Sequence, residues 1–183
     1  MTSSTPPTGP LEGYRILDLS TVLFGPYASQ MLGDLGADVI KIERLEGDGW
    51  RSAGQFRHRG MSGQFMAVNR NKRSLALDLK HPDGKAVLQR LVRTADVLVS
   101  NIRPAGLARL GFSYEDCRAL KPDLIYASAT GFGQDGPWRA RPAYDEIIQA
   151  ASGFASALGT EDEPAFVPSL VADKLCGMAL SSA

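Results

Sequence analysis

The stretch YRILDLSTVLFGPYASQMLGDLGADVIKIE, residues 14–43, decides the fold. Residues 14–20 form a short apolar run that is typical of a buried strand, and residues 38–43 form a second one. Between them, apolar residues recur at helical spacing after Pro26, which suits a first helical turn, and Gly36 is placed to end the helix. The stretch therefore predicts a strand–helix–strand unit, the arrangement that joins two parallel strands.

The rest of the chain repeats this alternation. Residues 44–64 are glycine-rich and charged, which predicts a long loop. Further strands are expected at residues 74–79, 96–101 and 123–133, and helices at 81–95, 103–112, 113–122, 141–159 and within 168–183. Because most strands are apolar throughout, we expect an α/β fold with an open, mainly parallel sheet and helices on both faces. Ligands of such sheets bind at the carboxyl ends of the strands.

Composition narrows the function classes. The 183 residues carry 20 Lys and Arg against 20 Asp and Glu, so net charge favours neither a nucleic acid nor an anionic membrane as partner. Two histidines and two cysteines without metal-type spacing argue against a metal centre. The polar, proline-rich start does not read as a signal peptide, and no apolar stretch is long enough to cross a bilayer. A cytoplasmic location is expected.

A local basic cluster offers an anion site on this neutral chain. The segment NRNKRS, residues 69–74, places Lys72 and Arg73 beside Asn69 and Asn71. Arginine can bind phosphate oxygens with two parallel hydrogen bonds, and lysine acts as a point charge. Other basic residues lie near predicted strand ends, namely Arg44, Arg103 and Arg109. Together they predict a basic rim for a ligand with more than one phosphate, although the residues alone favour an ordinary solvated strand entry.

The segment TGFGQDG contains a glycine pattern that resembles a dinucleotide-binding loop without its helix. Gly131, Gly133 and Gly136 have the G-x-G-x-x-G spacing of dinucleotide-binding loops. That function requires a helix to begin at the last glycine, whereas Pro137 follows Gly136 at once. The pattern therefore predicts a turn-rich loop, whose glycines could still let the backbone approach a ligand closely.

Asp173 is the acid whose role decides the chemistry. It follows the apolar segment PSLVA, so it could be partly desolvated, which would raise its pKa and strengthen it as a nucleophile. It could equally be a helix N-cap, and the residues alone favour the cap. Asp145 is expected to complement a helix dipole, and Cys176 is expected in the core.

Several motifs in register resemble the CoA-transferase family III, which includes carnitine-type CoA-transferases and α-methylacyl-CoA racemases. They are the opening segment from Leu11 to Arg44, followed by NRNKRSLALDL, ADVLVSNIRPAGLARLGF, LIYASATGFGQDGP and YDEIIQAASG. The resemblance implies a Rossmann-like large domain at residues 13–183, cut at its carboxyl end and lacking the small domain. It also implies an interlocked homodimer. The polar, proline-rich start predicts a disordered lead at residues 1–12.

The same resemblance implies the site. Asp173 is the implied catalytic residue, and the implied CoA-binding residues are Arg44, Asn69, Asn71, Lys72, Arg73, Asn101 and Arg109. No metal and no prosthetic group are implied, because CoA enters as an acyl-CoA substrate together with a carboxylic acid. The implied reaction passes through an aspartyl anhydride and an aspartyl-CoA thioester.

Two departures from the family bear on the reaction. Racemases of the family carry histidine where this chain has Tyr144, and an unperturbed tyrosine is a poor base at neutral pH. Members that handle oxalate-like acids carry glutamine in place of Leu23, so Leu23 and Phe24 indicate a less polar acyl group. Transfer is therefore favoured, and the alternatives are a racemase and a CoA-binding module without catalysis.

Overall fold

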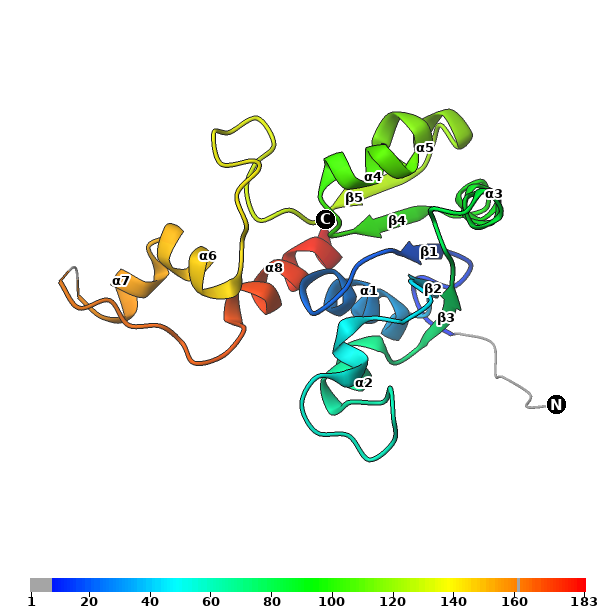
Figure 1. The fold of residues 1–183 in the computed structure, drawn as a ribbon. Helices are drawn as coiled ribbons and strands as arrows, with labels where there is room; N and C mark the ends of the chain where they lie inside the picture. Colours follow the sequence, from blue (N-terminus) through cyan, green and yellow to red (C-terminus); the bar gives the residue numbers. More distant parts are fainter. Residues whose placement is uncertain (1–7, 161) are drawn as a thin grey trace.

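The computed structural model describes residues 8–160 and 162–183, and its framework is a parallel sheet of five strands (Figure 1). The strand order is β3-β2-β1-β4-β5, all neighbours being parallel. The strands are β1 (Arg15–Asp18), β2 (Asp38–Glu43), β3 (Lys72–Ala76), β4 (Val97–Ser100) and β5 (Ile125–Ser128). The chain moves outward from β1 in one direction to β3 and then crosses back to β4, so the topological switch point lies between β1 and β4.

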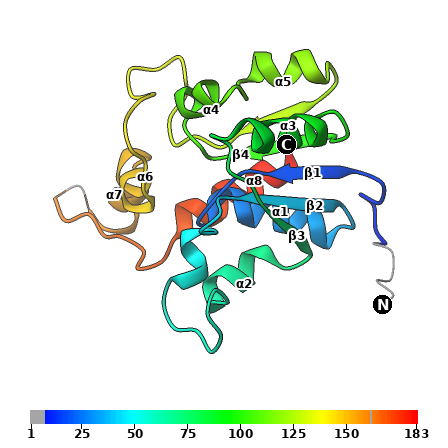
Figure 2. The same cartoon turned by 45° about the vertical axis from the view of Figure 1, so that its right-hand side comes forward.

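Helices cover both faces of the sheet, as the sequence predicts (Figure 2). One face carries α1 (Phe24–Asp34) and α8 (Val171–Ser182), which pack against each other. The other face carries α3 (Pro82–Val92), α4 (Pro104–Leu110) and α5 (Tyr114–Leu120). The remaining helices are η1 (Gly49–Ser52), α2 (Gly63–Asn69), α6 (Asp145–Ala151) and α7 (Phe154–Leu158). Helices α6 and α7 project beyond the sheet; α6 packs beside α8, and α7 packs against α6 farther from the sheet.

The core explains why the strands are apolar throughout. Successive side chains of a strand point to opposite faces, so a sheet covered on both sides must be apolar on both. Leu17 and Leu98 pack beneath α3, α4 and α5, whereas Ile16, Val39 and Val99 face the α1 side. Both sets are nearly or fully buried, and the strand pattern follows from this packing.

Local differences from the predicted elements have simple causes. Strand β3 begins at Lys72 instead of Ser74, so the strand starts within the basic run and contains Lys72 and Arg73. Helix α2 lies at the end of the predicted long loop, where Ser62 caps it by accepting a hydrogen bond of 3.0 Å from the Phe65 amide. The single helix predicted at residues 141–159 is two helices, because Gly153 adopts a φ of 79° between them.

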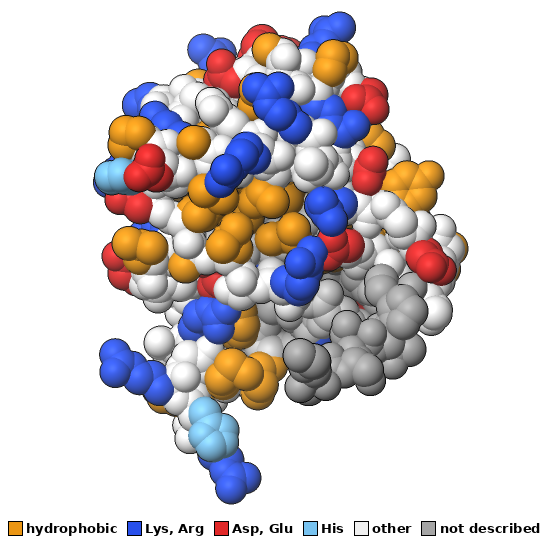
Figure 3. Space-filling view, turned by 90° about the vertical axis from the view of Figure 1, so that its right-hand side faces the viewer, with side chains coloured by type: hydrophobic (Ala, Val, Ile, Leu, Met, Phe, Trp, Pro, Cys, Tyr) orange, Lys and Arg blue, Asp and Glu red, His pale blue; other side chains and the backbone are white. Residues whose placement is uncertain are grey.

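The described surface mixes charges of both signs. In the face that Figure 3 shows, apolar side chains gather in the middle and Lys and Arg side chains surround them, with acidic side chains among them. Residues 1–7 of the predicted disordered lead lie outside the described residues. Residues 8–12 form a bend and turn in which the Leu11 amide donates to the Leu35 carbonyl at 3.0 Å. In the described part of the chain, no helix has the length and apolar character needed to cross a membrane.

Candidate active site

Two neighbouring cavities open at the carboxyl edge of the sheet, where an α/β fold binds its ligands. The larger cavity, of about 780 Å³, lies over the ends of β1, β2 and β3. The smaller cavity, of about 480 Å³, lies over the ends of β1, β4 and β5 and against α6 and α8. Val22, in the turn after β1, lines both cavities.

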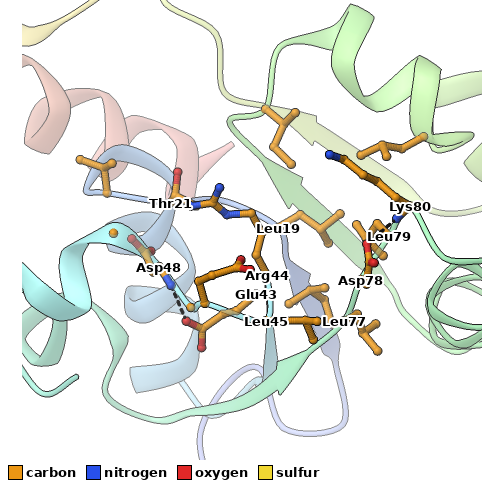
Figure 4. Close-up of a pocket in the computed structure, with 17 residues that line it drawn as sticks. Leu19, Thr21, Glu43, Arg44, Leu45, Asp48, Leu77, Asp78, Leu79 and Lys80 are labelled. Atoms are coloured by element: carbon orange, nitrogen blue, oxygen red, sulfur yellow. Dashed lines mark hydrogen bonds between the residues drawn. The ribbon is translucent and has the colours of Figure 1, made fainter. Parts of the chain in front are cut away.

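The larger cavity is largely apolar, and its rim carries charges of both signs (Figure 4). Arg44 and Lys80 are its basic residues, and its acidic residues are Glu43, Glu46, Asp48 and Asp78, of which Glu43 and Asp48 are paired with cations. Its apolar lining comes from leucines and one isoleucine, namely Leu19, Leu45, Leu77, Leu79, Leu110 and Ile102. Arg44 and Lys80 lie on opposite sides of this hollow. An apolar slot with a few cationic groups at its edge suits a flat ring system that carries phosphates.

An ion-pair network under the larger cavity holds its wall in place. Arg51 binds both carboxylate oxygens of Glu43, at 2.6 and 2.7 Å, and the Asp48 amide donates to Glu43 at 2.9 Å. Burial by itself raises the pKa of Glu43, but these bonds and one from Ser74 outweigh it and lower the pKa to about 2. Asp48 in turn pairs with Lys41 at 3.0 Å. The ionised Glu43 carboxylate therefore holds the segment after β2 against the sheet.

The Asn69–Arg73 stretch does not reach the same rim as Arg44. It lies at the start of β3, because Lys72 pairs in register with Val39 near the start of β2. The Lys72 ammonium is buried and donates to the Asp18 carboxylate at 2.9 Å and to the Pro26 carbonyl at 2.8 Å. The predicted convergence on one rim is wrong for this stretch, since the strand begins two residues earlier than expected.

The other members of the stretch also have partners within the chain. Asn69 is buried and accepts a hydrogen bond of 2.9 Å from Lys72. Asn71 donates to Asp34 at 2.6 Å, and Arg73 binds Asp38 at 2.6 to 3.0 Å. Their proposed contacts with CoA stay a prediction. Arg109 is exposed in the last turn of α4 and is absent from the described lining of both cavities.

Asn101 has a defined structural role at the switch point. Its side chain accepts from the Thr21 amide at 2.9 Å and donates to the Thr21 carbonyl at 2.7 Å. Val22, which follows Thr21, has a φ of 70°, a conformation that is unfavourable for a β-branched side chain. The two hydrogen bonds of Asn101 thus hold the strained turn that leads into α1. This turn separates the two cavities.

Asp173 lines the smaller cavity from the first turn of α8. The N-cap position belongs to Leu170, so the cap interpretation that the residues alone favour is wrong. Burial, followed by the charges of Asp145 and Glu146, raises the pKa of Asp173 to about 6. Within the described chain no donor binds its carboxylate, which leaves a partly desolvated acid facing a cavity.

Asp145 and Gln149 hold the segment that carries Asp173. Asp145 is 4% exposed, accepts from the Asp173 amide at 2.9 Å and accepts from the Gln149 side chain at 2.6 Å. Gln149 also accepts from the Val167 amide at 2.9 Å. The sequence predicts Asp145 at a helix start, where it lies, but does not predict this pair of hydrogen-bonded side chains, which we call the clamp. The available signal is the spacing of Asp145 and Gln149, two polar side chains four residues apart on one helix.

Apolar and aromatic groups complete the smaller cavity. Leu23 and Phe24 line it from the N-cap and first residue of α1, and Trp50 lines it from η1. Cys176, expected in the core, is half-buried and lines this cavity one turn after Asp173. Across residues 8–160 and 162–183, no group of three or more His, Cys, Asp or Glu side chains could hold a metal ion.

The glycine loop after β5 is turn-rich, as its prolines predict. Residues 131–144 contain turns and bends and no helix. A Cβ on Gly131 would lie 1.9 Å from the Ala143 side chain, so this glycine lets the two ends of the loop pack together. A Cβ on Gly133 would meet no atom within 4 Å. The loop can therefore return to α6 and form one wall of the smaller cavity.

Comparison with known proteins agrees with this geometry. The sequence profile of CoA-transferase family III matches residues 11–183. Succinate–glutarate CoA-transferase of Agrobacterium fabrum is 47% identical over 92% of this chain and 44% of its own length. Acetyl-CoA:oxalate CoA-transferase of Acetobacter aceti is 47% identical over 90% of this chain and 43% of its own.

A solved structure supports the same relationship. The crystal structure of a CAIB/BAIF family protein from Brucella suis is 39% identical, with a TM-score of 0.87 over 95% of this chain and 48% of that one. The chain thus spans about half the length of the relatives it matches.

Proposed function

Since the chain belongs to CoA-transferase family III, we propose that the protein moves CoA from an acyl-CoA donor to a carboxylic acid, with Asp173 as the nucleophile. One observation carries this proposal: the half-buried Asp173 carboxylate lines a cavity at the carboxyl edge of the sheet and has a raised pKa. A carboxylate that is poorly solvated and aimed at a cavity is a stronger nucleophile than one in water.

The proposed reaction proceeds by four acyl exchanges. The Asp173 carboxylate attacks the thioester carbonyl, the C–S bond breaks, and a mixed anhydride and CoA thiolate form. The thiolate attacks the aspartyl carbonyl and releases the donor acid, leaving an aspartyl-CoA thioester. The acceptor carboxylate then attacks the aspartyl-CoA carbonyl, the C–S bond breaks, and a second anhydride and CoA thiolate form. The thiolate attacks the acceptor carbonyl of this anhydride, which releases the new acyl-CoA and the free Asp173 carboxylate. Each difficult step is divided into easier ones, and the proton count does not change.

The cavities suggest how CoA would lie. The nucleotide would occupy the larger cavity, with its ring against the leucines and its phosphates near Arg44 and Lys80. The pantetheine arm would pass the strained turn at Val22 and bring the thioester to Asp173 in the smaller cavity. CoA is a substrate in this proposal, and no prosthetic group takes part.

Racemisation is the second candidate, and Tyr144 argues against it. Tyr144 lines the smaller cavity but is 70% exposed, and a phenol is a weaker general base than an imidazole at neutral pH. A CoA-binding module without catalysis is the third candidate. The implied homodimer and cytoplasmic location stay predictions, which sedimentation and cell fractionation of the full-length protein can check.

Covalent trapping tests the proposal. The full-length protein is incubated with a panel of acyl-CoA donors, reduced with borohydride, and digested for mass spectrometry. We expect a modified peptide at Asp173, and no modification in the Asp173→Asn variant. Asp83→Asn, which removes a fully surface-exposed acid of α3, should behave like the wild type.

Two outcomes distinguish the alternatives. Deuterium uptake at the α-carbon of an acyl-CoA, with no acceptor acid present, would identify a racemase. CoA binding without any trapped adduct across the panel would identify a binding module and overturn the transfer proposal.

A further inference from the structure

Three arginines line the smaller cavity together with Asp173: Arg103, Arg139 and Arg141. Arg103 is the N-cap residue of α4, and the other two belong to the loop after β5. In the described chain none of the three forms an ion pair with a carboxylate. All three residues are exposed, so their charges are accessible from solvent. Three arginines around one cavity, none of them paired with a carboxylate, favour an anionic ligand there.

Aromatic contacts order the loop that carries two of these arginines. The Arg141 guanidinium lies 5.2 Å from the Trp138 ring, and Trp138 meets Phe132 edge-on at 5.4 Å. Phe132 and Arg141 line the smaller cavity, and together with Trp138 they also line a neighbouring hollow, so Arg141 lies at the boundary between the two. Arginine stacks well on aromatic rings, so the loop can present its charges at a defined position.

The chemistry of the proposed reaction limits which anion needs them. A carboxylate that enters a thioester loses its negative charge, so it needs no permanent counter-ion. A second carboxylate on the same acid keeps its charge throughout the reaction, in a cavity that already contains Asp145, Glu146 and Asp173. It would be repelled there unless a permanent cation faces it, and arginine stays protonated at every physiological pH.

Dimensions separate this anion from the phosphates of CoA. A sphere with the volume of the smaller cavity, 480 Å³, is about 10 Å across, a usual size for a small-molecule site. Standard bond lengths place the two carboxyl carbons of a four- or five-carbon dicarboxylic acid about 4 to 5 Å apart, and the CoA sulfur roughly 15 Å from its diphosphate. Groups that share this cavity with Asp173 can therefore reach a second carboxylate more readily than the diphosphate.

The remaining walls suit a short methylene chain. Leu23, Phe24, Ile148 and Leu170 line the same cavity. Apolar walls favour an acid whose two carboxylates are separated by methylene groups over one whose carboxylates are directly joined. This extends the expectation of a less polar acyl group, because the spacer is apolar and only its far end is charged.

We propose that Arg103, Arg139 and Arg141 bind the non-reacting carboxylate of an aliphatic dicarboxylic acid with a short methylene spacer. The proposal rests on the proposed transfer of CoA to a carboxylic acid. It assigns the arginines a role in substrate specificity and leaves the CoA nucleotide to the larger cavity.

The test compares two acceptors of equal carbon number, glutarate and pentanoate, with one acyl-CoA donor and the full-length protein. In a double-displacement reaction, kcat/KM for the acceptor reports only the half-reaction with that acceptor. For Arg103→Gln and for Arg139→Gln, we expect kcat/KM for glutarate to fall about 10- to 100-fold, the usual effect of losing a charge-assisted contact. We expect kcat/KM for pentanoate to change less than threefold.

Two further variants sharpen the comparison. Arg139→Lys keeps the charge without the two-pronged geometry, so it should recover part of the glutarate activity. Arg118→Gln, an exposed arginine of α5 beside Tyr114, is the control and should leave both acceptors unchanged. Circular dichroism confirms that each variant is folded, and calorimetry measures its Kd for free CoA.

The outcomes are distinct. An equal loss with both acceptors together with a weaker Kd for CoA would assign the arginines to the CoA phosphates and overturn the inference. A wild type that accepts glutarate and pentanoate equally well would also overturn it, while the transfer proposal would stand. Absence of transfer to any acid, with no trapped adduct at Asp173, would instead remove the proposed function on which the inference rests.

Discussion

Replacing Asp145 with asparagine should move the acidic limb of the pH–rate profile. Asp145 accepts a hydrogen bond from the Asp173 amide and, after burial, contributes the larger of two charge effects that raise the Asp173 pKa from 3.8 to about 6. The variant removes this charge and retains the burial. We therefore expect the pKa to fall part of the way, by at most about one unit, because burial is the largest of the three causes and stays in place.

The size of the effect depends on pH in a calculable way. At pH 5.5, a carboxyl with a pKa of about 6 is about one-quarter ionised, whereas one with a pKa of about 5 is about three-quarters ionised. The ionised fraction of Asp173 in the variant should therefore be up to about three times that of the wild type at pH 5.5 and almost the same at pH 7.5. The profile of kcat/KM for the acyl-CoA donor measures this, because it reports the free enzyme.

Glu146→Gln is the matched comparison, because Glu146 is exposed and contributes the smaller charge effect. It should move the limb in the same direction by less. Asp145→Asn also removes one hydrogen-bond acceptor from the clamp, which should cost about 1–3 kcal/mol of stability, so assays are run well below its Tm. An acidic limb that stays in place, or moves to higher pH, would refute the assignment of Asp145 as the charge that tunes Asp173.

Three other predictions concern stability and the glycine loop. Because the folded-state pKa of Asp173 is raised, its ionisation opposes folding as the pH rises from about 4 to 6. Asp173→Asn should therefore increase the free energy of unfolding at pH 7.5 by about 1 kcal/mol after allowance for its exposure, and so raise the Tm there but not at pH 3.5. Lys72→Met strands a buried carboxylate and should cost about 3–5 kcal/mol in urea unfolding, whereas Arg73→Met, in an exposed pair, should cost under about 1 kcal/mol; equal costs would contradict this. Gly131→Ala should displace the loop and lower kcat/KM, and Gly133→Ala, with open space for its Cβ, should not; equal activities would argue against the close approach at Gly131.

Much of the architecture follows from local patterns in the chain. The apolar strands, the helical spacing after Pro26 and the positive φ of Gly36 are all properties of short segments, and the structure confirms them. Two element boundaries differ from the prediction, because α2 is short and lies at the end of a polar loop, and β3 begins within a basic run. The resemblance to the family makes Asp173 a candidate catalytic residue, whereas its immediate neighbours alone favour a helix N-cap, the position that Leu170 occupies.

The tertiary structure decided what each polar side chain faces. Burial and charge at Asp173 depend on Asp145, which is 28 residues away in the chain and meets it only when α6 packs beside α8. Lys72 points inward to Asp18 because two strands separated by a third place them on one face of the sheet. Residue type and periodicity specify the backbone elements, since these depend on nearest neighbours. Desolvation and charge pairing arise between distant segments, so only the folded chain determines them.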